Sequence, residues 1–230
     1  MSLFGRIPGV IFSPRATYAG VAARPRALGA LAFVVLISIA GTFTFLSTET
    51  GQQAMLDQQV RTMESFGVKM NDATYERIEQ VAGRAKYFGA AGQLIALPLE
   101  ALVVAGIAFA VFNAAQGGDG TFRQVFAVVS HSGVVIALSQ IFGLPLAYAR
   151  ENMSGATNLG VLAPFLDENS FPALVLGSVD LFMLWWAVSV AIGLGVLYRK
   201  RTGPIAATLI VVYVAIGVII AAVKSAVSGA

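Results

Sequence analysis

Three ionisable residues lie inside long hydrophobic stretches of the sequence. Glu100 belongs to FGAAGQLIALPLEALVVAGIAFAVF, and Asp180 belongs to LVLGSVDLFMLWWAVSVAIGLGVLY. The single histidine, His131, lies in a third apolar stretch. An ionisable side chain in hydrocarbon is costly unless it is paired, hydrated or protonated. Each of these three residues is therefore a candidate functional residue.

The depth of each residue follows from its place in its stretch. At about 1.5 Å rise per residue, Glu100 lies roughly 20 Å from the cytoplasmic end of its helix, Gln140 roughly 25 Å and Asp180 roughly 27 Å. On the same scale His131 lies only about 12 Å deep. We expect Glu100, Gln140 and Asp180 to share the outer half of the membrane, where they can meet, and His131 to lie apart from them.

Two interpretations of these polar residues remain open. In the functional one, the carboxylates bind a cation or a proton, or they line a small polar cavity. In the structural one, they are protonated or bonded to amides and hold helices together. A histidine such as His131 is more often a packing residue whose hydrogen bonds are satisfied.

The sequence lacks the motifs of an enzyme. It contains neither HExxH nor GxSxG, and no set of nucleophile, base and orienting group is visible. It has no cysteine, which excludes disulfides and thiolate sites, and a single histidine argues against a typical zinc site. We expect a protein that is not an enzyme and that carries no metal or cofactor.

The composition predicts an all-α membrane protein. Of the 230 residues 57% are hydrophobic and 12% charged, against about 25% charged in soluble domains. Five stretches are long enough to cross a bilayer, and the first is too long for a signal peptide and lacks a cleavage site. The predicted spans cover about residues 27–47, 87–114, 122–148, 173–198 and 204–223.

Two polar regions lie outside these spans. Residues 1–26 form a basic segment ahead of the membrane domain, 27–230, and SPRATYAGVAARP predicts a short helix. Arg15, Arg24 and Arg26 either hold this segment on the anionic inner leaflet or only fix the topology. Residues 48–86 predict a polar helical hairpin on the extracytoplasmic face, because apolar residues recur there at helical spacing.

The basic residues predict the orientation. Four arginines precede the first span, and Arg199, Lys200 and Arg201 connect the fourth and fifth. Placing both clusters in the cytoplasm puts the N-terminus inside and the C-terminus outside. The basic residues are otherwise scattered over loops, so we interpret them as topology signals and expect no nucleic-acid partner.

The fourth predicted span contains further candidate contacts. Trp185 and Trp186 lie in mid-span, where their rings can pack on helices or on a lipid chain. Gly193 and Gly195 offer a smooth face to a neighbouring helix. The expected partners are membrane lipids, and partnership with other membrane proteins or in a homo-oligomer is left open.

Three segments together resemble the Yip1-domain family. They are SPRATYAGVAARPRALGAL, GGDGTFRQVFAVVSHSGVV and DLFMLWWAVSVAIGLGVLYRKR, the last followed by a final hydrophobic helix. The resemblance implies five membrane helices, a cytoplasmic N-terminus and an outward C-terminus. Eukaryotic members act in ER–Golgi vesicle trafficking and bind Rab GTPases through a long N-terminal region. This chain has only about 26 residues there and looks more like the short prokaryotic members, a resemblance that implies a bacterial inner membrane.

The resemblance brings no catalytic residue with it, and only Asp180 matches a family position, the acid that opens the DLF-x-x-W segment. The leading hypothesis is a non-enzymatic membrane protein that organises lipids or partner proteins. The alternative is a small transporter or channel-like protein with a cation or proton site near Glu100 and Asp180.

Overall fold

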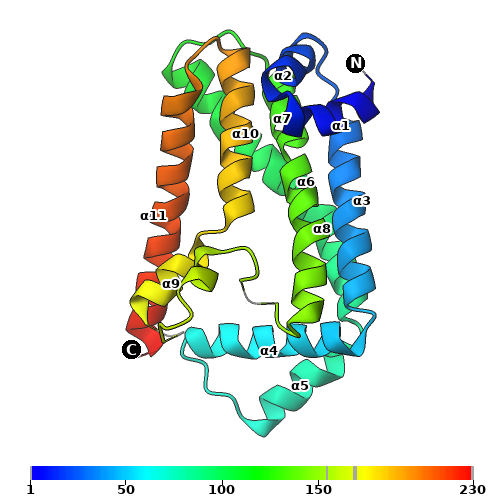
Figure 1. Ribbon diagram of the computed structural model, residues 1–230, viewed down its shortest axis with the longest axis vertical. Coiled ribbons are helices and arrows are strands. Elements are labelled where there is room, and N and C mark those ends of the chain that lie inside the picture. Colours follow the sequence, from blue (N-terminus) through cyan, green and yellow to red (C-terminus); the bar gives the residue numbers. More distant parts are fainter. Residues whose placement is uncertain (1, 154, 168–169, 229–230) are drawn as a thin grey trace. The chain divides into compact units, whose positions relative to one another are not determined.

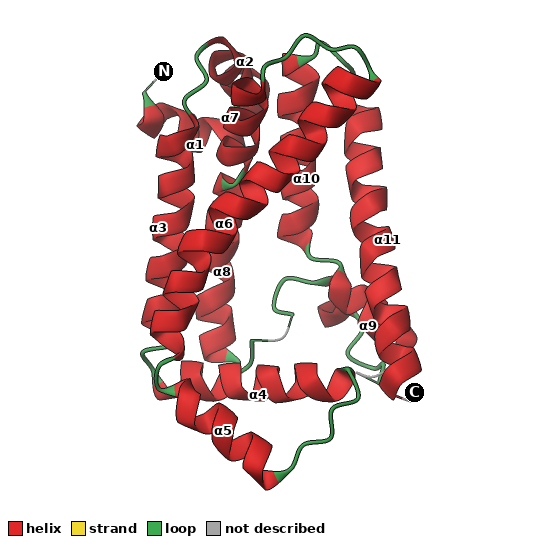
Figure 2. Ribbon diagram, turned by 180° about the vertical axis from the view of Figure 1, so that it is seen from behind, coloured by secondary structure: helices red, strands yellow, loops and turns green. Residues whose placement is uncertain are grey.

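The computed structural model describes residues 2–153, 155–167 and 170–228, and every regular element in them is a helix (Figure 2). This confirms the all-α prediction. In chain order the elements are α1 (Leu3–Phe12), α2 (Pro14–Ala23), α3 (Ala27–Phe45), α4 (Glu49–Ser65), α5 (Asp72–Ala82), α6 (Ala85–Phe109), the π-helix η1 (Ala110–Ala115), α7 (Phe122–Ser132), α8 (Val134–Ala149), the 3-10 helix η2 (Leu159–Leu162), α9 (Phe171–Ser178), α10 (Leu181–Leu197) and α11 (Thr202–Ser228).

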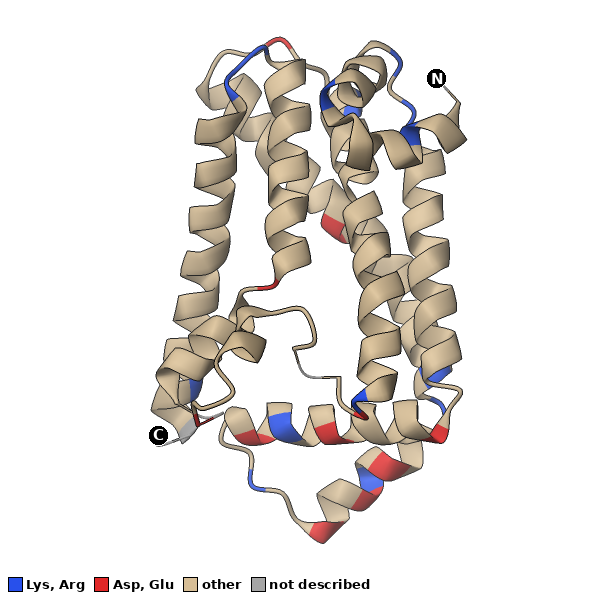
Figure 3. Ribbon diagram, in the orientation of Figure 1, with Lys and Arg blue, Asp and Glu red and all other residues tan. Residues whose placement is uncertain are grey.

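Within the described residues, four helical stretches are long and apolar enough to cross a membrane. They are Ala27–Phe45, Ala85–Ala115, Phe122–Ala149 and Thr202–Val227. Each agrees with a predicted span to within a few residues, and Figure 3 shows how few charged residues these helices carry. The long apolar runs were sufficient to find them, because a buried backbone in hydrocarbon must satisfy its own hydrogen bonds as helix.

The predicted fourth span is not one helix. Residues 173–198 were expected to be continuous, but α9 ends at Ser178 and α10 begins at Leu181, leaving Val179 and Asp180 extended. α10 alone has 17 residues and falls short of a full span by length. The helix is interrupted because residues far away in the sequence form hydrogen bonds with the backbone at this break.

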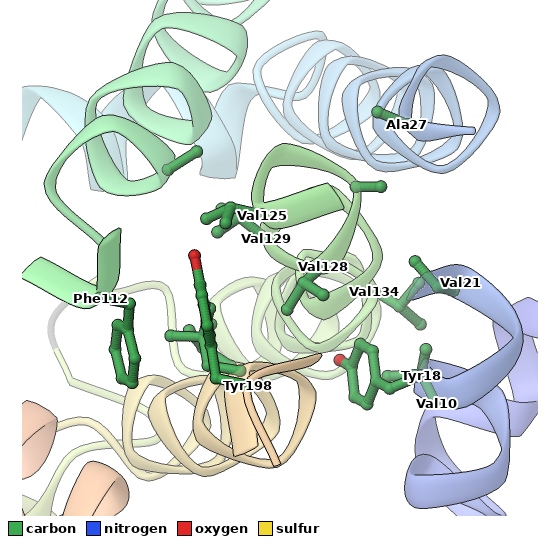
Figure 4. Close-up of a cluster of buried hydrophobic side chains, with 14 residues drawn as sticks. Val10, Tyr18, Val21, Ala27, Phe112, Val125, Val128, Val129, Val134 and Tyr198 are labelled. Carbon is green, nitrogen blue, oxygen red and sulfur yellow. The ribbon is translucent and has the colours of Figure 1, made fainter. Parts of the chain in front are cut away.

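The chain forms two compact units, and each has its own core. Unit 1 comprises residues 1–38, 92–139 and 182–211, and unit 2 comprises residues 39–91, 140–181 and 212–230. The core of unit 1 gathers side chains from α1, α2, α7 and α10, including Val10, Tyr18, Val128 and Leu194. In Figure 4 the ring of Tyr18 lies beside Val10 and close to the helix that carries Val128.

The N-terminal segment is more ordered than the sequence predicted. The expected short helix is present as α2, but α1 was missed. Its sequence, LFGRIPGVIF, contains Pro8 and two glycines, which are poor helix formers. Packing compensates for this weakness, because Val10 is buried in the core of unit 1 and Arg6 is only 5% exposed.

Unit 2 contains the predicted polar helical hairpin, made by α4 and α5 (Figure 1). Thr48 caps α4 by accepting from the backbone N–H of Gly51 at 3.0 Å, and Asn71 caps α5 by accepting from Thr74 at 2.8 Å. α4 packs Ala54 against Phe45 and Leu46, whereas α5 buries none of its residues. The hairpin is therefore anchored through its first helix.

Candidate functional site

Glu100 lies on an exposed face of α6. Leu99 is 56% exposed and Val103 is 52% exposed, so the carboxyl is surrounded by apolar side chains that also point outward. Glu100 makes no hydrogen bond or ion pair with any described residue. The helix that carries it is one of the four long apolar stretches. The carboxyl thus lies in a helix long and apolar enough to span a membrane, and the described residues of unit 1 provide no partner for it.

His131 has the opposite environment. Its side chain is fully buried in α7, and Nδ1 donates to the carbonyl of Ala127 at 2.7 Å. That bond fixes the proton on Nδ1, and Nε2 has no partner among the described residues. Glu100 and His131 both belong to unit 1, where one is exposed and the other is enclosed.

Asp180 occupies the break between α9 and α10. Its Oδ2 accepts a hydrogen bond from the hydroxyl of Thr157, and its backbone N–H donates to the hydroxyl of Tyr213 at 3.0 Å. Asp180 also forms an isolated antiparallel bridge with Asn158. An extended piece of the preceding loop therefore lies alongside the opened helix and fixes the carboxylate.

The backbone groups that the break would expose are satisfied by the surrounding chain. The hydroxyl of Tyr213 donates to the carbonyl of Ser178 at 2.8 Å, and Asn158 donates to the carbonyl of Gly177 at 2.8 Å. The backbone N–H of Leu159 donates to the carbonyl of Val179 at 2.9 Å. Irregular backbone inside a membrane protein requires such partners. These three donors explain how the helix opens at low cost.

The remaining predicted residues differ in how far their side chains are buried in the protein. Gln140 is half-buried in α8, and Trp186 packs against the core of unit 1. Trp185 is 36% exposed and stacks on Phe182, with ring centroids 6.1 Å apart. Of the two tryptophans, Trp185 has the larger outer surface for a lipid chain.

The predicted set is distributed over both units. Glu100 and His131 belong to unit 1, whereas Gln140 and Asp180 belong to unit 2. Within the described residues, no group of three or more His, Cys, Asp or Glu side chains is arranged to hold a metal ion. A shared ion or proton site made by Glu100, Gln140 and Asp180 stays a prediction.

A buried hydrogen-bond chain in unit 1 escaped the sequence analysis. The hydroxyl of Tyr18, on α2, lies 2.7 Å from the hydroxyl of Ser132 on α7 and 2.6 Å from that of Ser189 on α10. All three side chains are buried. The signal in the sequence was the pair of serines inside apolar helices, which need a partner there.

The donors in this chain can be assigned. Ser132 donates its hydroxyl proton to the carbonyl of Val128 at 3.0 Å, so its oxygen is left to accept from Tyr18. Tyr18 then accepts from Ser189. The protons run in one direction, from Ser189 through Tyr18 and Ser132 to the backbone of α7. One tyrosine therefore joins the N-terminal segment to two membrane helices.

Ionisation of Tyr18 is expected to lower the stability of the fold at alkaline pH. Burial raises the pKa of Tyr18 from 10.0 to about 12, and the hydrogen bonds with Ser132 and Ser189 lower it only in part. Because the pKa of this phenol is higher in the folded state than in the unfolded state, its contribution to stability is fully present below pH 10. The contribution is lost as the pH rises toward 12. We expect the difference in unfolding free energy between the wild type and Tyr18→Phe to fall by roughly 3 kcal/mol over this interval.

Unfolding in detergent, followed by tryptophan fluorescence at a series of pH values, measures this difference. Tyr18→Phe keeps the ring and removes only the ionising group, so other titrations cancel. A difference that stays constant from pH 10 to pH 12 would contradict the assignment.

The N-terminal arginines differ in their surroundings. Arg6 donates through Nη1 to the carbonyl of Arg24 at 3.2 Å and through Nη2 to that of Gly20 at 3.4 Å, closing the C-terminal end of α2. Burial, then the charges of Arg26 and Arg24, lower the pKa of Arg6. Arg24 and Arg26 are exposed, as is Arg15, which donates to the hydroxyl of Thr202 at 3.5 Å. The sequence did not distinguish buried Arg6 from the exposed three.

The chain is similar to a known membrane protein over most of its length. It is 25% identical over 186 residues to the membrane protein YknW of Bacillus subtilis (strain 168), an alignment that covers 81% of this chain and 75% of YknW. No solved structure matches the chain. The model of the Yip1 domain matches residues 9–223. The chain is therefore an integral membrane protein that belongs to the Yip1 domain family.

Proposed function

We propose that this Yip1 domain protein is a non-enzymatic organiser of anionic lipids at the cytoplasmic surface of a bacterial inner membrane. The observation that carries the proposal is the build of the N-terminal segment in unit 1. α1 and α2 are tied to each other by Arg6 and to α7 and α10 by Tyr18. They form a fixed platform, defined here as residues 3–26, and not a loose tail.

The outer surface of this platform combines apolar and basic side chains. Phe4 is 85% exposed and Phe12 is 82% exposed, and Arg15, Arg24 and Arg26 are exposed beside them in sequence. Aromatic rings that enter the acyl boundary, together with arginines near the headgroups, are typical of segments that lie on an anionic leaflet. The platform is suited to gather acidic lipids around the protein.

The proposed orientation follows from the same unit. The bond from Arg15 to Thr202 brings α2 next to the turn with Arg199, Lys200 and Arg201. The two basic clusters of the sequence are thus neighbours, which supports placing both in the cytoplasm with the C-terminus outside. In this proposal α9 and α10 together make the fourth of five crossings.

Native mass spectrometry of protein purified with mixed lipids tests the proposal. We expect the wild type to retain phosphatidylglycerol in preference to phosphatidylethanolamine. Replacing Arg15, Arg24 and Arg26 by glutamine should weaken this retention by about 1 kcal/mol per arginine removed. The arginines act as headgroup ligands here, so their loss changes lipid selectivity.

A charge-matched control separates this effect from net charge. Replacing Lys69, Arg77 and Arg84 by glutamine removes three charges in and around α5. The control variant should retain phosphatidylglycerol like the wild type. Equal losses in the two variants, or no preference in the wild type, would contradict the proposal.

A further inference from the structure

One side of α1 is apolar along its whole length and is exposed. Phe4, Pro8 and Phe12 follow one another at intervals of four residues, which places them on the same side of the helix. All three are exposed, the two phenylalanines by 85% and 82%. Arg6, the only charged residue of α1, and Val10 are buried on the opposite side. The helix therefore turns its charge inward and presents two aromatic rings outward.

Contacts within unit 1 place α1 at the end of an apolar helix. Leu3 packs on the first turn of α3, where a Cβ at Gly29 would lie 3.0 Å from Cδ2 of Leu3. α3 is long and apolar enough to cross a membrane, and Leu28 on the same turn is 77% exposed. α1 runs crosswise to the beginning of α3 in Figures 1 and 2, and thus along the membrane surface. The lipid that surrounds this turn of α3 also covers the apolar side of α1.

The rings of α1 are held at this level because the other side of the helix is fixed. Arg6 donates to the carbonyls of Gly20 and Arg24, which ties α1 to the end of α2. Val10 is buried in the core of unit 1. A helix held in this way pushes its rings between the headgroups and spreads the lipids of one leaflet. Such insertion is easiest where the leaflet is loosely packed, as in one that is convex toward the protein's inserted side.

Insertion and charge are carried by different residues of the platform. Phe4 and Phe12 supply apolar area, whose burial depends on access to the acyl chains. Arg15, Arg24 and Arg26 supply charge, whose attraction depends on the acidity of the headgroups. The response of the protein to lipid packing can therefore be separated from its response to lipid charge.

We propose that the α1 stripe, made by Phe4, Pro8 and Phe12, is a lipid-packing sensor that concentrates the protein where the acyl chains of the cytoplasmic leaflet are poorly covered by headgroups. The partner of the stripe is the acyl boundary of that leaflet. The inference rests on the proposed function, since it takes the platform to lie on lipid at the cytoplasmic surface. It adds a dependence on membrane curvature that lipid charge does not determine.

Single-vesicle imaging of the reconstituted full-length protein tests the proposal. The chain has no cysteine, so Ala19→Cys, at an exposed position of α2, provides one site for a dye. A membrane-impermeant dye added after reconstitution labels only molecules whose platform faces outward. The vesicles contain phosphatidylglycerol and phosphatidylethanolamine in one ratio and differ in diameter. We expect the dye per membrane area to be about twofold higher on the smallest vesicles than on the largest.

Variants of the stripe show whether α1 causes this preference. Replacing both Phe4 and Phe12 by serine should abolish the dependence on diameter, and Phe12→Ser alone should reduce it. The matched control replaces Phe66 and Phe165, which are 47% and 82% exposed and belong to unit 2. It should keep the dependence of the wild type. An undiminished dependence in the stripe variants, or an equal loss in the control, would overturn the proposal. Thermal melts identify any variant that has lost its fold, and Phe12→Ser then decides the case if the double variant unfolds.

Native mass spectrometry of the same proteins separates this inference from the proposed function. The stripe variants keep Arg15, Arg24 and Arg26, so they should still prefer phosphatidylglycerol. A wild type that prefers phosphatidylglycerol but has equal density on all vesicles would overturn the packing sensor and leave the proposed function standing. A wild type that accumulates on small vesicles without this preference would support the sensor and contradict the selection of acidic lipids.

Discussion

Replacing Tyr18 with alanine is expected to lower the free energy of unfolding by about 3–5 kcal/mol. Tyr18 is fully buried and is among the largest enclosed side chains of the protein. Its loss leaves a cavity between α2, α7 and α10, removes the acceptor of the Ser189 hydroxyl, and leaves the oxygen of Ser132 without the donor that Tyr18 supplies. Both effects act at the point where the N-terminal segment is attached.

The conservative variant Tyr18→Phe separates the stability lost through the cavity from the stability lost with the hydrogen bonds. It fills the cavity but removes the shared hydroxyl, so we expect a loss of about 1–3 kcal/mol from the unsatisfied serines. Unfolding in detergent, followed by tryptophan fluorescence, measures both variants. A Tyr18→Ala protein within about 0.5 kcal/mol of the wild type, the usual range for surface changes, would show that Tyr18 does not anchor the segment.

This anchor also connects stability to the proposed function. The platform presents its arginines at defined positions only while Tyr18 holds α2 against the membrane helices. We therefore expect Tyr18→Ala to lose the preference for phosphatidylglycerol although all arginines are present. A variant that unfolds more easily but keeps full lipid selectivity would indicate that the basic charges act without the platform.

Four of the spans could be predicted because they depend on local information. A run of about 20 apolar residues determines a membrane helix whatever its neighbours are. The same runs placed Glu100 and His131 in membrane helices, and the structure agrees. What the runs could not give is the direction in which Glu100 points, because α6 has apolar residues on every side of the helix.

The break at Val179 and Asp180 could not be predicted for a related reason. Residues 173–198 read as one apolar run, and the groups that open it come from Thr157 and Tyr213, which are 23 and 33 residues away from Asp180. Tyr18 is similar, since its two serine partners lie 114 and 171 residues along the chain. Hydrogen bonds over such separations leave no periodic pattern in the sequence.

Gly193 is the position where a larger side chain should be least tolerated in the core of unit 1. A Cβ at this residue of α10 would lie 2.4 Å from Cγ1 of Val128 and 3.0 Å from Cδ1 of Tyr18. Both neighbours are fully buried, and the β-branched Val128 has little freedom to rotate away. We expect Gly193→Val to lower the free energy of unfolding by about 3 kcal/mol, the upper range for overpacking.

The Gly193→Ala variant shows which of two opposing effects on stability is larger. Replacing a glycine inside a helix by alanine gains up to about 1 kcal/mol of helix propensity, while overpacking costs about 1–3 kcal/mol. The clash should prevail, so Gly193→Ala is expected to destabilise the protein by about 1 kcal/mol. The matched control is Gly106→Ala in α6, where an added Cβ meets nothing within 4 Å and the propensity gain acts alone. If both alanine variants proved more stable than the wild type in detergent melts, α2, α7 and α10 would be less closely packed at Gly193 than these contacts require.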